Sequence, residues 1–134
     1  MLLLDERIRD DGTHVRAFAS LAGDRVEVRD EDGARGLLSV AALDRVMVRY
    51  GRALEAPMPD PMPMETRASD VLDLPGGYRL RRMRFHAIVD AEGRDYLVWE
   101  RPDGEPLAAI ATMVTAALRY LVLRLAGVVG PSGN

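Results

Sequence analysis

The chain has 134 residues, of which 48% are hydrophobic and 29% are charged, a balance that fits one compact domain or two halves that share a core. A chain of this length buries roughly 65 to 70% of its unfolded surface, so its core needs no disulfide or metal ion to close it. The absence of cysteine excludes disulfide frameworks, thiol nucleophiles and Cys-ligated metals, and it suits a reducing compartment. We therefore expect a cytoplasmic protein.

The charges almost balance, because 18 basic and 21 acidic residues give a net charge of −3. Every basic residue is arginine, which leaves no lysine for Schiff-base chemistry. Each planar guanidinium group can bind a carboxylate or a phosphate through two hydrogen bonds. Because the overall charge is negative, any surface that binds nucleic acid has to be local.

Short extended runs, separated by turns rich in Asp and Gly, occupy the first 38 residues: 2–9, 13–20, 25–30 and 34–38. This spacing predicts an antiparallel meander. Ser39 stands where a helix N-cap belongs. The apolar residues that follow recur every three or four positions and predict an amphipathic helix over 39–54. Gly51 marks either the end of that helix or a weak point in its last turn.

Four alternating prolines over residues 57–63 predict an extended, polyproline-like spacer. The segment is either a stiff connector across the body of the protein or a docking motif for a proline-binding domain. Residues 64–77 are compatible with one or two short strands that end at a turn over 74–77.

The second half begins with two extended runs, 78–89 and 95–101, on either side of a turn in which Gly93 can adopt the left-handed conformation. This turn predicts a hairpin with favourable cross-strand pairs on both faces. The expected partners are Phe85 with Trp99, Ala87 with Leu97 and Arg84 with Glu100.

A final helix is expected from Pro106 to about Ala126. Thr112, Thr115 and Arg119 outline a narrow polar stripe on it, and apolar side chains cover most of the remaining circumference. One sheet face is too small to bury all of them, so either the helix over 39–54 or another copy of the chain covers the second side. We expect a homo-oligomer. Because Arg119 and Arg124 oppose insertion into a bilayer, we expect no membrane partner.

In chain order these elements are strands and a helix, a Pro-rich spacer, then strands and a helix. They predict an α+β fold with a mainly antiparallel sheet and two helices, in a single domain 1–134 whose halves, 1–56 and 64–130, are joined by the spacer 57–63. This predicted order resembles that of Whirly-type single-stranded DNA-binding proteins, which pair two strand-rich halves that each end in a helix. Their lysine-containing motif has no counterpart in a chain without lysine.

The candidate binding residues lie on and beside the expected strand 78–89. Alternation places Arg82, Arg84 and His86 on one face, which Tyr96 of the next strand is expected to share, and Met83 with Phe85 on the opposite, core face. Guanidinium groups and aromatic rings together are what single-stranded nucleic acids use for backbone contact and base stacking. The candidate nucleic-acid-binding residues are Arg79, Arg81, Arg82, Arg84, His86 and Tyr96.

Three functions are compatible with this pattern. The first is a non-catalytic, oligomeric binding module that holds single-stranded nucleic acid on the arginine strand. The second is a protein-interaction or structural subunit whose strand arginines pair with acids such as Glu100 and Asp103. The third is a small enzyme that uses His86 as a base, although no motif supplies a nucleophile or an orienting group. No motif indicates a metal or a cofactor, so we expect neither.

Overall fold

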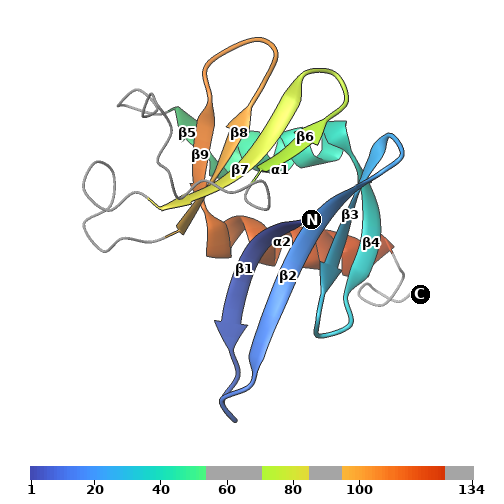
Figure 1. The fold of residues 1–134 in the computed structure, drawn as a ribbon, viewed down its shortest axis with the longest axis vertical. Coiled ribbons are helices and arrows are strands. Elements are labelled where there is room, and N and C mark those ends of the chain that lie inside the picture. The colour runs from blue at the N-terminus through green and yellow to red at the C-terminus, as the bar shows by residue number, and fades with distance from the viewer. Residues whose placement is uncertain (54–70, 85–94, 126–134) are drawn as a thin grey trace.

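The computed structural model describes residues 1–53, 71–84 and 95–125. Their elements form two antiparallel sheets and two helices (Figure 1), which confirms the expected α+β class. The Pro-rich spacer 57–63 and the turn over 90–94 lie outside the described residues. Neither helix of the described chain has the length and apolar character needed to cross a bilayer.

The first sheet, which we call sheet A, is the meander predicted from the sequence. Its four strands are neighbours in chain order. They are β1 (Leu2–Ile8), β2 (His14–Ala22), β3 (Arg25–Asp30) and β4 (Arg35–Ser39). Alternate residues such as Ala17, Ala19, Val26 and Val28 are buried on one face, as the period of two in a strand requires.

Helix α1 (Val40–Tyr50) begins and ends at the residues that the sequence marks. The Ser39 Oγ accepts a hydrogen bond from the Ala42 N–H at 3.1 Å, and the Gly51 N–H donates to the Met47 carbonyl oxygen at 2.7 Å. A Cβ at Gly51 would lie 2.5 Å from that oxygen, so only glycine fits this tight end. The expected continuation to residue 54 is therefore wrong, and the chain passes directly into the short strand β5 (Arg52–Ala53).

Sheet B contains the remaining strands and has the order β5-β9-β8-β7-β6. Strand β6 (Val71–Leu74) ends at the turn expected over 74–77, where Gly76 and Gly77 have φ of +84° and +86°. Strands β7 (Tyr78–Arg84) and β8 (Asp95–Glu100) follow, and then β9 (Leu107–Ile110). All neighbouring strands in the sheet are antiparallel.

The predicted register of the β7–β8 hairpin is wrong. Trp99 lies opposite Leu80 instead of Phe85, and Glu100 lies opposite Arg79 instead of Arg84. Leu80 and Trp99 are both fully buried in the main core, so the burial of this pair, and not the geometry of the turn, sets the register. The observed register differs from the predicted one by an odd number of residues, so the two faces of β7 are exchanged. Met83 therefore lies on the face opposite to Trp99.

The predicted start of the last helix is also wrong. Residues Leu107–Ile110 form β9, which pairs with β8, and helix α2 spans Ala111–Leu125. The alanines at 108 and 109, which suit a helix by propensity, are buried in the sheet. Tertiary context outweighs local preference here, because β9 provides the neighbour that β8 needs on that side.

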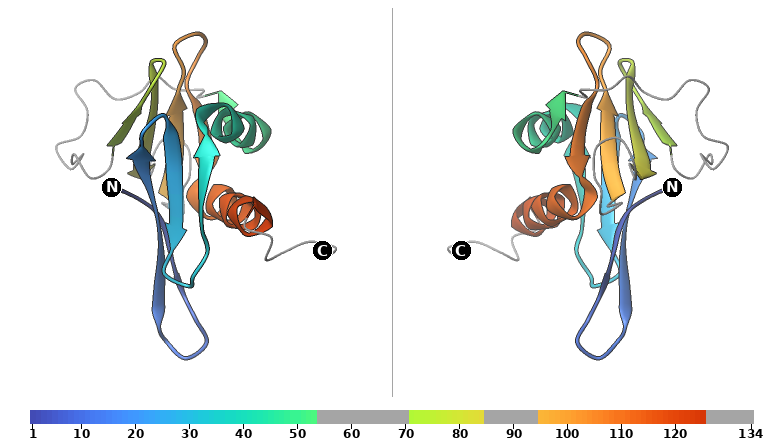
Figure 2. Two further views of the ribbon diagram at one scale, coloured as in Figure 1. Left: turned by 90° about the vertical axis from the view of Figure 1, so that its right-hand side faces the viewer. Right: turned by 90° about the vertical axis from the view of Figure 1, so that its left-hand side faces the viewer.

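The main core lies between the two sheets and the two helices, which sit on the same side of the molecule (Figure 2). Helix α2 contacts both sheets and packs against α1, so α1 is the element that covers its second side. Gly36 on β4 permits a close approach, because a Cβ there would lie 2.9 Å from the Cβ of the buried Val122.

Candidate interaction surface

The described arginine side chains of β7 are paired with carboxylates. The Arg79 Nε lies 2.5 Å from the Asp73 Oδ1, and the Arg81 Nε lies 2.6 Å from the Glu100 Oε2. The Asp73 carboxylate raises the pKa of Arg79 further above its ordinary value. Each guanidinium group would have to leave its carboxylate, or share it, in order to hold a phosphate.

The remaining candidates from the sequence do not gather on one face. Arg82 lies on the main-core face of β7 and forms an ion pair with Asp95. Tyr96 lies opposite Met83 on the other face, where it is only 9% exposed and packs in a small apolar cluster. The expectation that Arg82 and Tyr96 share a surface is therefore wrong. The Arg84 side chain and His86 lie outside the described residues.

The Asp5 carboxylate on β1 of sheet A lies close enough to Arg82 and Asp95 of sheet B for both charges to act on it. Burial raises the pKa of Asp5, and the nearby Asp95 charge raises it further. A hydrogen bond from the Glu6 N–H and the charge of Arg82 act in the opposite direction and lower it. Because desolvation is the largest of these effects, the ionised form of Asp5 costs stability in the native state.

Asp5→Asn is expected to raise the melting temperature at pH 7. The pKa of Asp5 is higher in the native state than in the unfolded chain, so native stability falls as pH rises through that interval and the loss is complete at neutral pH. Asparagine keeps the acceptor for the Glu6 N–H without the charge. Thermal unfolding followed by circular dichroism from pH 3 to pH 8 should show the gain growing with pH and vanishing at the acidic end.

The neighbouring Glu6 supplies a control of opposite sign. A hydrogen bond from Arg16 lowers the pKa of Glu6, so its charge favours the native state above the unfolded pKa. Glu6→Gln should therefore lower the melting temperature slightly at pH 7. A lower melting temperature for Asp5→Asn at pH 7 would contradict the argument from burial.

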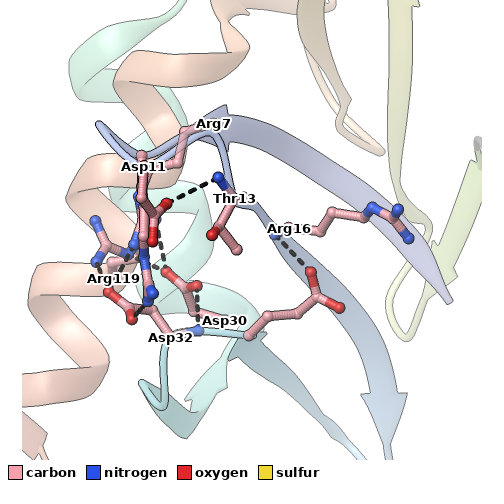
Figure 3. Close-up of polar contacts among 9 residues, drawn as sticks. Arg7, Asp11, Thr13, Arg16, Asp30, Asp32 and Arg119 are labelled. Carbon is pink, nitrogen blue, oxygen red and sulfur yellow. Dashed lines mark hydrogen bonds and ion pairs between the residues drawn. The ribbon is translucent and has the colours of Figure 1, made fainter.

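A second polar cluster lies where α2 crosses sheet A (Figure 3). The Asp30 carboxylate is fully buried and pairs with Arg7 at 3.0 Å and with Arg119. Asp32 pairs with Arg7 at 2.9 Å and with Arg9. Arg119 also lies 3.9 Å from the Asp32 carboxylate. Each carboxylate is thus held by at least two guanidinium groups, which is the arrangement of a structural network that joins α2 to the sheet.

The outer faces of α1 and α2 form a different kind of surface, which we call the helical surface. Val48, Met113 and Tyr120 are about half exposed on it. Exposed arginines accompany these apolar side chains on both helices. The helical surface comprises Arg45, Val48, Arg49, Met113, Tyr120 and Arg124.

The arginines of the helical surface have no carboxylate partner among the described residues. Arg124 instead lies over the ring of Tyr120 at 5.7 Å, and Arg49 lies over Tyr50 at the same distance. The only acidic residue in the two helices is Asp44. Its Oδ1 accepts a hydrogen bond from the Trp99 Nε1–H at 2.7 Å, so it is engaged with sheet B.

The helical surface was not predicted from the sequence, although the scarcity of acidic residues in the two helices was a signal for it. Helix α2 contains no acidic residue and α1 contains only Asp44, whereas acidic residues outnumber basic ones in the whole chain.

No group of three or more metal-ligating side chains occurs within residues 1–53, 71–84 and 95–125. The chain matches no protein-family model, no curated protein and no solved structure.

Proposed function

We propose that this chain is a non-catalytic protein-interaction module and that its binding surface is the helical surface. One observation carries the proposal. The described arginines of β7 are each neutralised by a carboxylate. Arg45, Arg49 and Arg124 have no carboxylate partner within the described part of the chain, and half-exposed apolar side chains lie on the same two helices.

This composition favours contact with a protein. Interface cores are enriched in Arg, Met and aromatic residues relative to the rest of a protein surface, and Arg124, Met113 and Tyr120 supply all three. Apolar side chains that gather on one face mark an interaction site more often than scattered ones do. The proposal includes a cytoplasmic location, which a chain without cysteine suits.

The other expectations from the sequence stay predictions. Single-stranded nucleic acid would have to displace the carboxylates that hold Arg79, Arg81 and Arg82. An enzyme that uses His86 depends on a residue outside the described part of the chain. The expected homo-oligomer no longer has to cover the second side of α2, because α1 packs there.

Site-specific photo-crosslinking tests the proposed function. The photoreactive amino acid p-benzoylphenylalanine is placed at position 113 in one variant and at position 37 in another. Met113 is 47% exposed on the helical surface, and Leu37 is 46% exposed on sheet A, so the two probes are matched in accessibility. After irradiation in cells that naturally contain the protein, we expect a discrete protein adduct from position 113 and none from position 37.

Other outcomes would refute the proposal. Equal adducts from both positions would indicate unspecific contact, and no adduct from position 113 would remove the helical surface as a binding site. Adducts that nuclease treatment degrades would favour the nucleic-acid alternative.

A further inference from the structure

We infer that the helical surface binds an acidic helical peptide in which carboxylates flank the apolar side chains. This inference rests on the proposed interaction function and specifies the chemistry of the partner.

The charge of the helical surface has a single sign. Arg45, Arg49 and Arg124 are exposed without a described carboxylate partner, and the carboxylate of Asp44 accepts from Trp99. The surrounding protein has a net charge of −3, so the positive potential here is local. Carboxylates are the complementary groups on a protein partner, and a guanidinium group binds them with short, charge-assisted hydrogen bonds.

The spacing of the exposed side chains indicates how a peptide would lie. Arg45 and Arg49 are four residues apart, which places them on one face of α1 about 6 Å apart along its axis. Met113 and Tyr120 are separated by two turns of α2, or about 10.5 Å. Apolar residues at positions i and i+7 of a helical peptide match the spacing on α2, and carboxylates four residues apart match the spacing on α1.

Arg124 adds a preorganised donor to this surface. Its guanidinium group lies 5.7 Å from the centre of the Tyr120 ring, a contact that restricts an otherwise flexible side chain. Less conformational entropy is lost when a group that is already ordered binds its partner. Tyr120 and Arg124 together therefore offer one apolar and one ionic contact within a single turn of α2.

Other occupants fit less well. A symmetric contact between two copies would join two surfaces that both carry arginines and that supply no free carboxylate to pair with them, which disfavours that contact. A nucleic acid would supply phosphates but no aliphatic groups to cover Val48 and Met113. The tested occupant is therefore the peptide, and membranes and nucleic acids are used as competing probes.

The experiment selects peptides from a random 16-residue display library on the immobilised full-length protein. Enriched peptides are then measured by fluorescence anisotropy against the wild type and two double variants. Arg45→Glu with Arg49→Glu changes the helical surface. Arg25→Glu with Arg29→Glu makes the same charge change at two exposed arginines of β3 that have no described carboxylate partner.

We expect the enriched peptides to share an excess of Asp and Glu interspersed with large apolar residues. Their affinity should fall by about tenfold or more for the helix variant, because two attractive contacts become repulsive. It should change by less than about twofold for the β3 variant, whose substitutions lie off the binding surface. If the glutamate variant does not fold, the double variant Arg45→Gln with Arg49→Gln takes its place. A smaller loss of peptide affinity is then expected.

Each other result overturns the inference. Peptides without an acidic excess that still lose affinity for the helix variant would leave the interaction function intact and refute the acidic partner. Equal losses for both double variants would indicate a diffuse charge effect. Failure to enrich any shared pattern would count against the inference and the proposed function together. Stronger dependence on Arg45 and Arg49 for phosphatidylserine vesicles or single-stranded DNA than for peptides would assign the surface to those ligands.

Discussion

Asp30→Ala is expected to lower the free energy of unfolding by about 3 to 5 kcal/mol, the usual cost of removing one partner from a buried ion pair. The Asp30 side chain is fully buried, and its Oδ2 lies 3.0 Å from the Arg7 Nη1. Arg119 of α2 contacts the same oxygen, and the Oδ1 accepts a hydrogen bond from the Asp32 N–H at 2.9 Å. Alanine would leave two partly buried guanidinium groups without this acceptor at the contact between α2 and sheet A (Figure 3).

Urea unfolding followed by circular dichroism measures this effect, and Asp32→Ala is the matched control. Asp32 contacts the same arginines, but its side chain is 37% exposed, so its removal should cost at most about 1 kcal/mol. Asp30→Asn keeps an acceptor for the Asp32 N–H and should lie between the two. Equal losses for Asp30→Ala and Asp32→Ala would show that burial does not strengthen the Asp30 contacts.

Local patterns predicted the first half of the fold well. The turns that separate the strands of sheet A depend on Asp and Gly close together in the sequence. Ser39 and Gly51 delimit α1 through hydrogen bonds within four residues. Such signals act over a few residues of the chain, so they can be read without knowing the tertiary structure.

Long-range packing decided what the sequence could not predict. The register of β7 against β8 depends on the burial of Leu80 beside Trp99, and a turn motif carries no information about that pair. Residues 107–110 form a strand because β8 offers them a free neighbouring position. The faces of β7 followed from the wrong register, so the grouping of Arg82 with Tyr96 was wrong as well.

The candidate surface was missed for a related reason. The arginines of one strand do not reveal the carboxylates opposite them, because Asp73 belongs to β6 and Asp95 and Glu100 belong to β8. Pairing becomes visible only when the strands are placed side by side. The helical surface depends in the same way on knowing that Asp44 contacts Trp99 from a distant part of the chain.

Trp99→Ala should cost about 3 to 5 kcal/mol, as expected for a large aromatic ring in a core. Trp99 is fully buried and stacks on Tyr78 with ring centres 5.1 Å apart. Its Nε1–H is the donor to the Asp44 Oδ1, so the same side chain ties α1 to sheet B. Because a domain of this size has only about 5 to 15 kcal/mol of stability, the variant is expected to be marginally folded at best.

Trp99 is the only tryptophan, so its fluorescence reports on its own burial. Iodide should quench the native protein weakly and the unfolded protein strongly, and strong quenching of the native state would contradict the structure. Trp99→Phe keeps most of the ring but removes the donor to Asp44, and should cost about 1 to 3 kcal/mol for the unpaired acceptor. Tyr120→Ala on the helical surface should change stability by no more than about 0.5 kcal/mol, because the Tyr120 side chain is 53% exposed and lies outside the core.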